Sequence, residues 1–332
     1  MESTYILLNQ IIISYIVHIS EFIIMRKEKI IKMTSQVKSE EAKENSFFSL
    51  TDRESSEYSQ NCCAFCNEES GVWLYHANCM EFMDMLISRH PEGRFDMIFA
   101  DPPYFLSNGG ITCHAGKMVK VDKGQWDKSN GPEMNHEFNL AWLSRCQNIL
   151  KPNGSIWVSG THHVIHSVGY AMHQLGMKIL NDITWEKPNP PPNLSCRYFT
   201  HSTETIIWAA KNEKSKHCFN YDMMREINNG KQMKSVWTMT APNNDEKKFG
   251  KHPTQKPLQL LERIIMAGTA EGDWVFDPFS GSSTTGVASV KLGRKFVGCE
   301  LESEFVKLSV KRLEAAINQK ASCLDFTGVS KS

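Results

Sequence analysis

An apolar run of six residues, Phe95–Ala100, is followed at once by Asp101 and two prolines. The run has the length and composition of a buried strand, and Pro102 and Pro103 end it because proline fixes φ and lacks an N–H. A carboxylate, a rigid carbonyl and the ring of Tyr104 are therefore expected at the end of one strand. Such a set suits a planar amine, whose two hydrogens are accepted while the ring stacks on the attached heterocycle. An ordinary capping turn explains the tetrapeptide equally well.

Strand and helix patterns alternate along most of the chain. The predicted strands are 72–76, 95–100, 155–159, 177–186, 203–210, 274–276 and 295–300. The predicted helices are 80–87, 136–150, 163–175, 258–267, 287–292 and 302–317. This alternation predicts an α/β fold with a mainly parallel sheet and helices on both faces.

Charge is balanced over the whole chain but not within one region. The 332 residues contain 37 Lys and Arg against 37 Asp and Glu, so no global basic excess indicates nucleic acid. Residues 211–256, however, hold ten basic side chains against five acidic ones, with Phe219, Tyr221 and Trp237 among them. Basic residues interleaved with aromatic ones fit a nucleic-acid surface, and a solvated charged face is the alternative.

The ends of the chain lack the pattern of a packed domain. Residues 5–24 are rich in Ile and Leu but interrupted by polar residues, which makes a poor membrane span. We predict a poorly structured extension over 1–61, a tail over 318–332 and no membrane partner. Scattered cysteines favour a reducing, cytoplasmic location. Cys62, Cys63 and Cys66 lack a second closely spaced pair, so no metal site is expected.

A second candidate site lies near the C-terminus. The strand 274–276 leads into a turn of small residues over 277–286, then a helix, then a strand that ends at Glu300. Small residues let a ligand approach the backbone, and the acid can bind two ribose hydroxyls. Pro278 and Phe279 would obstruct a pyrophosphate, which favours a nucleoside without phosphates. A plain helix cap is the alternative.

Three motifs in order carry a family resemblance. Asp101-Pro102-Pro103-Tyr104, the segment His252–Pro257 (HPTQKP) and the segment Asp277–Thr284 (DPFSGSST) together resemble the β-group amino-methyltransferases of DNA, in which the catalytic half precedes the S-adenosylmethionine half. A closer similarity is to the second GATC adenine methylases of DpnII-type restriction-modification systems. The segments that carry it are 101–110, 123–128, 193–205 and 230–237.

The resemblance implies an S-adenosylmethionine-dependent methyltransferase fold, Rossmann-like, with a mostly parallel sheet and circularly permuted motif order. It implies a methyltransferase domain over 62–317, with a catalytic half 72–210, a target-recognition region of about 188–250 and a cofactor half 251–317. The implied activity is methyl transfer to N6 of a flipped-out adenine in a specific DNA site, GATC, within a restriction-modification system.

The resemblance also assigns site residues, none of them to a metal. The implied catalytic residues are Asp101, Pro102, Pro103 and Tyr104. The implied cofactor residues are Asn78, Cys79, Asp101, His252, Thr254, Lys256, Asp277, Pro278, Phe279, Gly281, Ser283, Thr284 and Glu300. The implied DNA contacts are Lys117, Lys123, Trp126, Ser195, Arg197, Lys231 and Lys234. Asn78 stands where the family usually has Asp, and Ser283 replaces a common Gly, so both are expected to weaken cofactor binding without abolishing it.

Several alternatives stay open at this point. The chain could modify adenine in another site such as GANTC, modify cytosine N4, or bind nucleic acid without catalysis. The implied partner is double-stranded DNA, with single-stranded DNA as an alternative that avoids base flipping. A restriction endonuclease is implied as a functional partner without necessarily binding, and a homodimer is a further expectation.

Overall fold

The computed structural model describes residues 62–106, 111–114, 117–120, 127–129 and 131–328. The chain divides into two units, residues 1–61 and 62–332, and every described residue belongs to the second unit. The predicted N-terminal extension therefore lies outside the described residues. None of the described helices is both long and apolar enough to cross a membrane.

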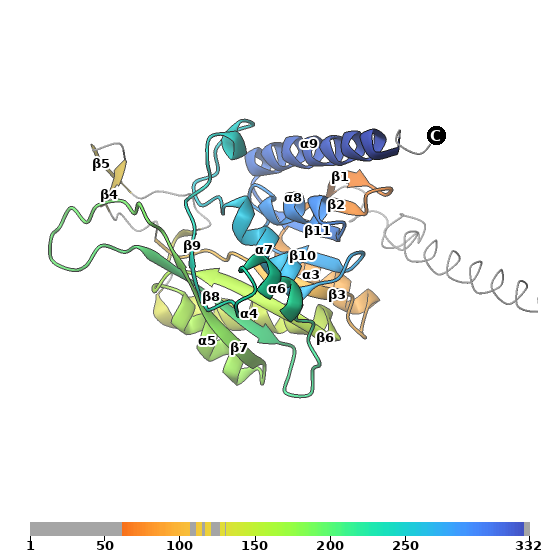
Figure 1. The fold of residues 1–332 in the computed structure, drawn as a ribbon. Helices are drawn as coiled ribbons and strands as arrows, with labels where there is room; N and C mark the ends of the chain where they lie inside the picture. The colour runs from red at the N-terminus through yellow and green to blue at the C-terminus, as the bar shows by residue number, and fades with distance from the viewer. Residues whose placement is uncertain (1–61, 107–110, 115–116, 121–126, 130, 329–332) are drawn as a thin grey trace, which may run out of the picture. The chain divides into compact units, whose positions relative to one another are not determined.

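Nine strands of the described residues form one sheet in the order β1-β2-β11-β10-β3-β6-β8-β7-β9, and its part from β1 to β6 runs from top to bottom in Figure 1. Their bounds are β1 Cys63–Asn67, β2 Val72–His76, β3 Phe95–Ala100, β6 Leu150–Gly160, β7 Lys178–Glu186, β8 Thr203–Ala210, β9 Val236–Thr238, β10 Trp274–Asp277 and β11 Lys295–Glu300. The five strands from β2 to β6 in this order are mutually parallel, whereas β1 and β8 run the opposite way. The mostly parallel α/β fold is confirmed.

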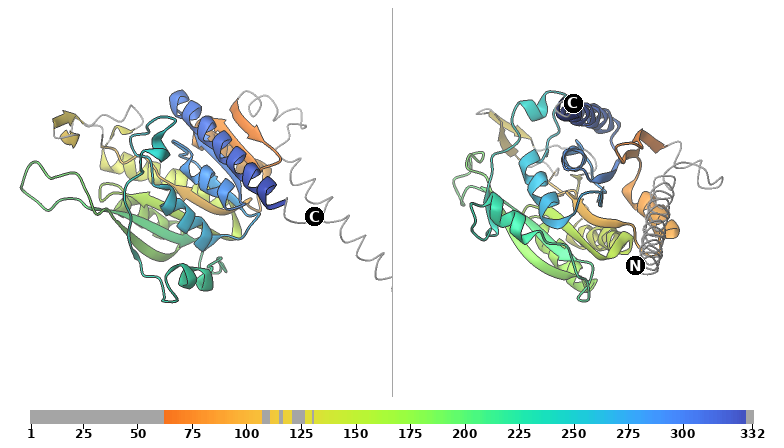
Figure 2. Two further views of the ribbon diagram at one scale, coloured as in Figure 1. Left: turned by 45° about the horizontal axis from the view of Figure 1, so that its top comes forward. Right: turned by 45° about the vertical axis from the view of Figure 1, so that its right-hand side comes forward.

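The order of strands separates the helices into two groups. The chain moves in one direction across the sheet from β2 to β3 to β6, and in the other direction from β10 to β11. Because such crossovers are right-handed, the connecting helices fall on opposite faces. Helices α3, α4 and α5 pack in one group, and α6, α7, α8 and α9 in the other (Figure 2). Their bounds are α3 Cys79–Arg89, α4 Pro132–Ile149, α5 Ile165–Gln174, α6 Tyr221–Ile227, α7 Leu258–Gly268, α8 Thr284–Lys291 and α9 Ser303–Gly328.

The core contains stacked aromatic rings and one very close helix contact. Trp157 of β6 and Trp208 of β8 stack with ring centroids 4.5 Å apart. On α8, a Cβ placed on Gly286 would lie 2.6 Å from a ring carbon of Phe296 and 2.7 Å from a methyl of Leu313. Glycine at 286 therefore lets α8 press against β11 and α9. This contact fixes the helix that begins directly after the small-residue turn.

Several elements differ from the sequence-based prediction. The edge strands β1 and β9, helix α6, and the hairpin of β4 (Ile111–His114) with β5 (Lys117–Lys120) were not predicted. They are short, and β4 and β5 fall in a segment rich in Gly and polar residues, so periodicity gave no signal. Helix α9 continues to Gly328, past the predicted start of a tail at residue 318, because residues 318–327 contain no Pro or Gly to stop it.

Candidate functional site

A cavity of about 290 Å³ lies where β2, β3, β10 and β11 end. Its walls come from residues 77–80, 101–104, 277–282, 284–285 and 299–302, at the ends of these strands, and from 252 and 254–256 ahead of α7. Ligand crevices of open α/β sheets lie at this carboxyl edge. The two sites predicted far apart in the sequence therefore open into one cavity.

The segment after β3 is held in place by a buried acid. The backbone N–H of Tyr104 donates to Asp127 Oδ1 at 2.9 Å, and that of Leu106 donates to Asp127 Oδ2 at 3.1 Å. Asp127 is fully buried. The Tyr104 hydroxyl in turn donates to Asp101 Oδ1 at 2.5 Å. Asp127 thus fixes the backbone of the tetrapeptide, while Tyr104 fixes the orientation of the Asp101 carboxylate.

A lysine and a second carboxylate complete this corner of the cavity. The Lys256 ammonium donates to Asp101 Oδ2 and, at 3.0 Å, to the Tyr104 hydroxyl, and it lies 3.6 Å from Glu204 Oε2. Glu204 Oε1 accepts from Lys187. The four charged groups alternate in sign, in the order Asp101, Lys256, Glu204 and Lys187. Such alternation is what allows buried charges to be accommodated.

Burial and pairing shift the pKa values of these groups in opposite directions. Burial raises the pKa of Asp101, although Lys256 opposes the shift. Burial would lower the pKa of Lys256, but the Asp101 and Glu204 carboxylates outweigh it and the pKa is raised. Burial and the same two carboxylates raise the pKa of Tyr104 well above its ordinary value. Tyr104 therefore remains a hydroxyl donor, and Asp101 is a better proton acceptor than an exposed Asp.

Asp277 ends β10 and is almost fully buried, with 3% of its surface exposed. Its Oδ1 accepts from the Phe279 N–H at 3.0 Å, and its Oδ2 accepts from the Thr285 hydroxyl at 2.6 Å. These hydrogen bonds favour the ionised form, but burial is the larger effect and raises the pKa of Asp277 to about 7. Its charge at neutral pH thus depends on what else occupies the cavity.

Glu300 ends β11 and is tied to the small-residue turn. Its Oε2 accepts from the Gly281 N–H at 2.7 Å and its Oε1 accepts from the Glu302 N–H at 2.8 Å. Gly281 has φ +53°, and a Cβ there would lie 3.1 Å from the His252 ring. Glycine is required here both for the left-handed backbone and for the close approach of His252. The turn, Glu300 and the segment 252–256 therefore form one rigid wall.

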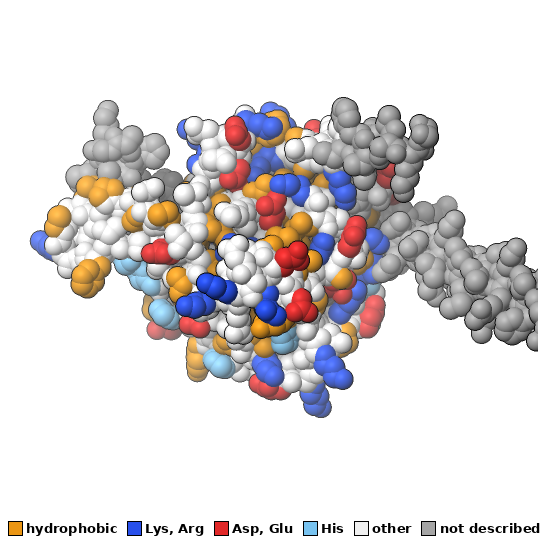
Figure 3. Space-filling model, viewed as in Figure 1, with side chains coloured by type: hydrophobic (Ala, Val, Ile, Leu, Met, Phe, Trp, Pro, Cys, Tyr) orange, Lys and Arg blue, Asp and Glu red, His pale blue; other side chains and the backbone are white. Residues whose placement is uncertain are grey.

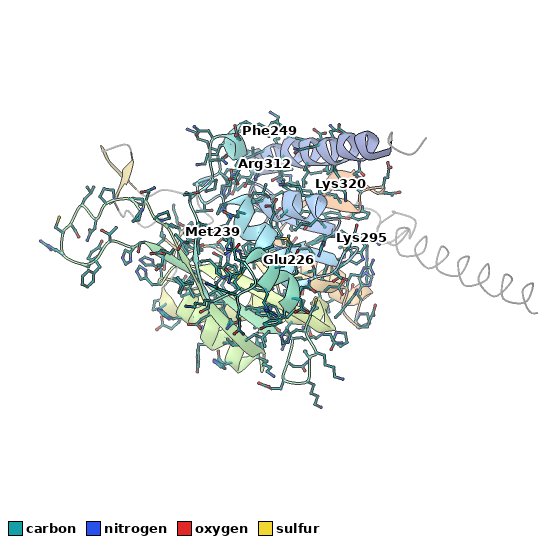
Figure 4. All side chains as sticks on the ribbon, in the orientation of Figure 1. Glu226, Met239, Phe249, Lys295, Arg312 and Lys320 are labelled. Carbon is teal, nitrogen blue, oxygen red and sulfur yellow. The ribbon has the colours of Figure 1, made fainter. Side chains whose placement is uncertain are left out.

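A buried arginine supports the turn from behind. Arg312, which Figure 4 labels on α9, donates from Nη1 to the Ser282 carbonyl, to the Ser282 hydroxyl at 2.8 Å and to the Thr284 hydroxyl at 2.9 Å. Burial lowers the pKa of Arg312 to about 10. The sequence analysis did not select Arg312. The sequence did offer one indication of a buried role, since Arg312 is a charged residue among the apolar positions of its helix.

The predicted cofactor residues line the cavity with one exception. Ser283 is fully buried at φ +52° and bonds through its hydroxyl to the Ser280 hydroxyl at 2.7 Å, so it shapes the turn without facing the cavity. Asn78 lines the cavity and also caps α3, since its Oδ1 accepts from the Met80 N–H at 2.9 Å. Cys79 is an unreactive thiol here, because burial raises its pKa to about 12.

Comparison with known proteins identifies the family. The family model described as DNA methylase (N6_N4_Mtase) matches residues 95–311, which span both halves of the cavity wall. The chain belongs to the DNA methylase family.

Named relatives of this DNA methylase cover most of its length. It is 58% identical to the type II methyltransferase M2.DpnII of Streptococcus pneumoniae, over 73% of this chain and 89% of the relative. It is 56% identical to the type II methyltransferase M2.LlaDCHI of Lactococcus lactis subsp. cremoris, over 74% of this chain and 90% of the relative. Among solved structures, the M1.HpyAVI complex with S-adenosylmethionine is 30% identical and covers 73% of this chain and 98% of its own, with a TM-score of 0.56.

The predicted DNA contacts whose side chains the structure describes are not among the residues of the cavity wall. Ser195 and Arg197 are exposed on the loop between β7 and β8, which extends away from the sheet (Figures 1 and 2). Lys231 and Lys234 are exposed between α6 and β9. Lys123 and Trp126 lie outside the described residues, as does the side chain of Lys117.

The same loop carries large exposed side chains that the sequence analysis did not select. Phe199 is 97% exposed, Tyr198 61% and Leu194 49%. Figure 3 shows hydrophobic side chains along this outward loop. Asn193 orders the preceding turn, because its Oδ1 accepts from both the N–H and the hydroxyl of Ser195. Several large apolar side chains exposed together on one short loop are typical of a binding surface.

Proposed function

We propose that this DNA methylase transfers a methyl group from S-adenosylmethionine to N6 of a flipped-out adenine in GATC, within a restriction-modification system. One observation carries the proposal. Asp101 and Tyr104 share a single cavity with Asp277 and Glu300, so groups suited to an amine face groups suited to a nucleoside. A methyl donor and a target base bound to these two sets would meet inside the cavity.

The cavity fits the charge and polarity of S-adenosylmethionine. That cofactor carries a sulfonium and an ammonium, and the described lining residues include five carboxylates and a single lysine, Lys256. The carboxylates are those of Asp101, Asp127, Asp277, Glu300 and Glu302. Glu300 is oriented to bind the ribose hydroxyls, since an ionised carboxylate accepts more hydrogen bonds than Gly281 and Glu302 provide. Gln255 Oε1 is a further acceptor in the wall, buried without a partner among the described residues.

When bound, the cofactor supplies an electrophilic methyl group whose bond to sulfur breaks as the bond to nitrogen forms. The chain itself must prepare the nitrogen, because the lone pair of an adenine amino group is delocalised into the ring. Asp101 and the Pro102 carbonyl accept its two N–H groups and so favour the pyramidal, nucleophilic form. Asp101 then takes the surplus proton, a role that its raised pKa supports. The Tyr104 ring in the cavity wall is the surface on which the base stacks.

Two observations favour adenine over cytosine as the target base: the residue at the first position of the motif 101–104, and the names of the relatives. The chain has Asp rather than Ser at position 101, and its relatives include a DpnII-type methylase at 58% identity. We assign residues 188–250 to target recognition, 72–210 to the catalytic half and 251–317 to the cofactor half. Extrusion of an adenine from a duplex costs a few kcal/mol, which contacts from the loop between β7 and β8 would offset.

The test is transfer of labelled methyl groups to a panel of single-stranded and double-stranded oligonucleotides that contain GATC, GANTC or a scrambled site. We expect label in adenine of GATC, and a loss of about 10²- to 10³-fold in the Asp101→Ala variant while cofactor affinity is retained. Label in cytosine alone, or none in GATC, would overturn the specific assignment. A folded Asp101→Ala protein with wild-type activity would refute the mechanism.

A further inference from the structure

Glu204 is a buried carboxylate with no part in the mechanism above. Its side chain is 11% exposed, its Oε1 is bound by Lys187, and its Oε2 lies 3.6 Å from the Lys256 ammonium and 3.4 Å from the Tyr104 hydroxyl. It is not among the described residues that line the cavity, whereas its neighbours Lys256 and Tyr104 are. Glu204 can therefore act on the reaction through those two side chains, and its charge also raises the pKa of Asp101.

Lys256 occupies the position that the reaction needs for an amine. The Tyr104 hydroxyl binds Asp101 Oδ1, and the Lys256 ammonium binds Asp101 Oδ2. The proposed chemistry requires Asp101 to accept an N–H of the target base. Lys256 and the incoming amino group are both nitrogen donors, so they compete for Asp101, and a carboxylate that stays paired with an ammonium is a weaker acceptor for the base.

We propose that Glu204 is a positioning residue, which receives the Lys256 ammonium when the amino group of the target base replaces it on Asp101. The inference rests on the proposed function. The required movement is small, since 3.6 Å exceeds a charge-assisted hydrogen bond by less than about 1 Å. A buried ammonium without an acceptor is strongly unfavourable. With carboxylates on two sides, Lys256 stays paired before and after the exchange.

The exchange also places charge where methyl transfer needs it. The target nitrogen gains positive charge as the new bond forms, and an ammonium on the same carboxylate would oppose that change. Bound to Glu204, Lys256 leaves Asp101 to the target. The groups that face the ammonium are Asp101, Tyr104 and Glu204. Lys187 acts on it through Glu204, and the charge of Asp101 in turn raises the pKa of Asp277.

The variant Glu204→Gln keeps the shape of the side chain and removes its charge. We expect kcat to fall about 10- to 100-fold, while the Kd for S-adenosylmethionine stays within about twofold of wild type. Glu204 is one of two carboxylates that raise the pKa of Lys256, so Lys256 should lose its proton at a lower pH in the variant. The activity of the variant should therefore recover at alkaline pH, and Glu204→Asp should restore part of kcat at neutral pH.

Two controls separate this role from a structural one. Glu262→Gln on α7 removes a carboxylate that pairs with Lys291 outside the cavity lining and should leave kcat unchanged. In a Lys256→Met background, Glu204→Gln should lose most of its effect, because no ammonium remains to be received and only the direct charge of Glu204 on Asp101 is removed. An equal loss in that background, or a wild-type kcat and pH profile for Glu204→Gln, would overturn the proposal.

A measurement without DNA distinguishes failure of this inference from failure of the proposed function. The Lys256 ammonium can be titrated by NMR in protein with labelled lysine, in wild type and in Glu204→Gln. A lower pKa of Lys256 in the variant supports the pairing, and an unchanged pKa overturns it whatever the substrate. If the wild-type protein methylates none of the oligonucleotides, the proposed function fails instead.

Discussion

Replacing Asp277 by Asn should remove the contribution of this carboxyl group to the dependence of folding stability on pH. Burial raises the pKa of Asp277 from 3.8 to about 7 in the folded protein. The folded state thus binds this proton more tightly than the unfolded state does. The resulting stabilisation is fully present below about pH 4 and is lost as the pH rises to about 7. Between pH 5 and pH 8 the contribution of Asp277 to the free energy of unfolding should fall by about 2.5 kcal/mol.

The assay is urea unfolding at a series of pH values from 5 to 8, for wild type and Asp277→Asn. From pH 5 to pH 8 the wild type should lose about 2.5 kcal/mol more than the variant. Asn retains an oxygen for the Phe279 N–H, and the Thr285 hydroxyl can turn to accept from its amide. Glu226→Gln, at an exposed position of α6 labelled in Figure 4, serves as a control whose curve should follow the wild type. Parallel pH curves for wild type and Asp277→Asn would refute the reasoning.

The same group should couple cofactor binding to pH. A cationic cofactor favours the ionised form of Asp277, so its binding to wild-type protein should release a proton below about pH 7. We expect the Kd for S-adenosylmethionine, measured by calorimetry, to decrease from pH 5.5 to pH 8 in the wild type and to change less in Asp277→Asn. Equal pH dependence in the two proteins would show that Asp277 does not sense the cofactor.

Two further predictions concern packing and DNA. Gly286→Ala should lower the free energy of unfolding by about 1–3 kcal/mol, because its Cβ would lie 2.6 Å from Phe296. Gly169→Ala is the control, because its Cβ would approach only a side-chain methyl, at 3.2 Å, and its free energy of unfolding should stay close to that of wild type in the same denaturant titration. Equal stability of the two variants would contradict the packing argument. Phe199→Ser should raise the Kd for oligonucleotides about 5- to 50-fold without changing the melting temperature, since Phe199 is 97% exposed. Unchanged oligonucleotide affinity in a binding titration would exclude Phe199 from the DNA surface.

The sequence was most informative where strands are parallel. Asp101, Asp277 and Glu300 each end an apolar run, and parallel strands bring their carboxyl ends to one edge. Their meeting in one cavity could therefore be predicted without coordinates. The roles of Asp127 and Arg312 were not predicted, because each acts on a segment more than twenty residues away in the chain, and local patterns do not show which segment a side chain contacts.

Glu204 was missed for a topological reason. It is the second residue of β8, and the start of a parallel strand would lie at the edge opposite the cavity. Instead, β8 is antiparallel to both of its neighbours, β6 and β7. In the pairing with β6, Thr205 of β8 lies opposite Gly160, the last residue of β6. Its first residues therefore lie at the carboxyl edge of β3 and β6. Local periodicity does not reveal strand direction, so the sequence could not place Glu204 beside Asp101.

The reversal of β8 also connects the outward loop to the catalytic corner. The loop leaves the sheet after Lys187 and returns at Thr203, just before Glu204. Lys187 and Glu204, which flank the loop, form an ion pair with each other. Glu204 in turn lies 3.6 Å from Lys256, which binds Asp101. A nucleic acid held by Tyr198 and Phe199 would therefore act on a loop whose base is linked through Glu204 to Lys256. A series of ion pairs thus runs from Lys187 through Glu204 and Lys256 to Asp101. Movement of Lys187 on DNA binding would therefore change how strongly Glu204 binds the Lys256 ammonium. Target binding and release of Asp101 are thus expected to be coupled.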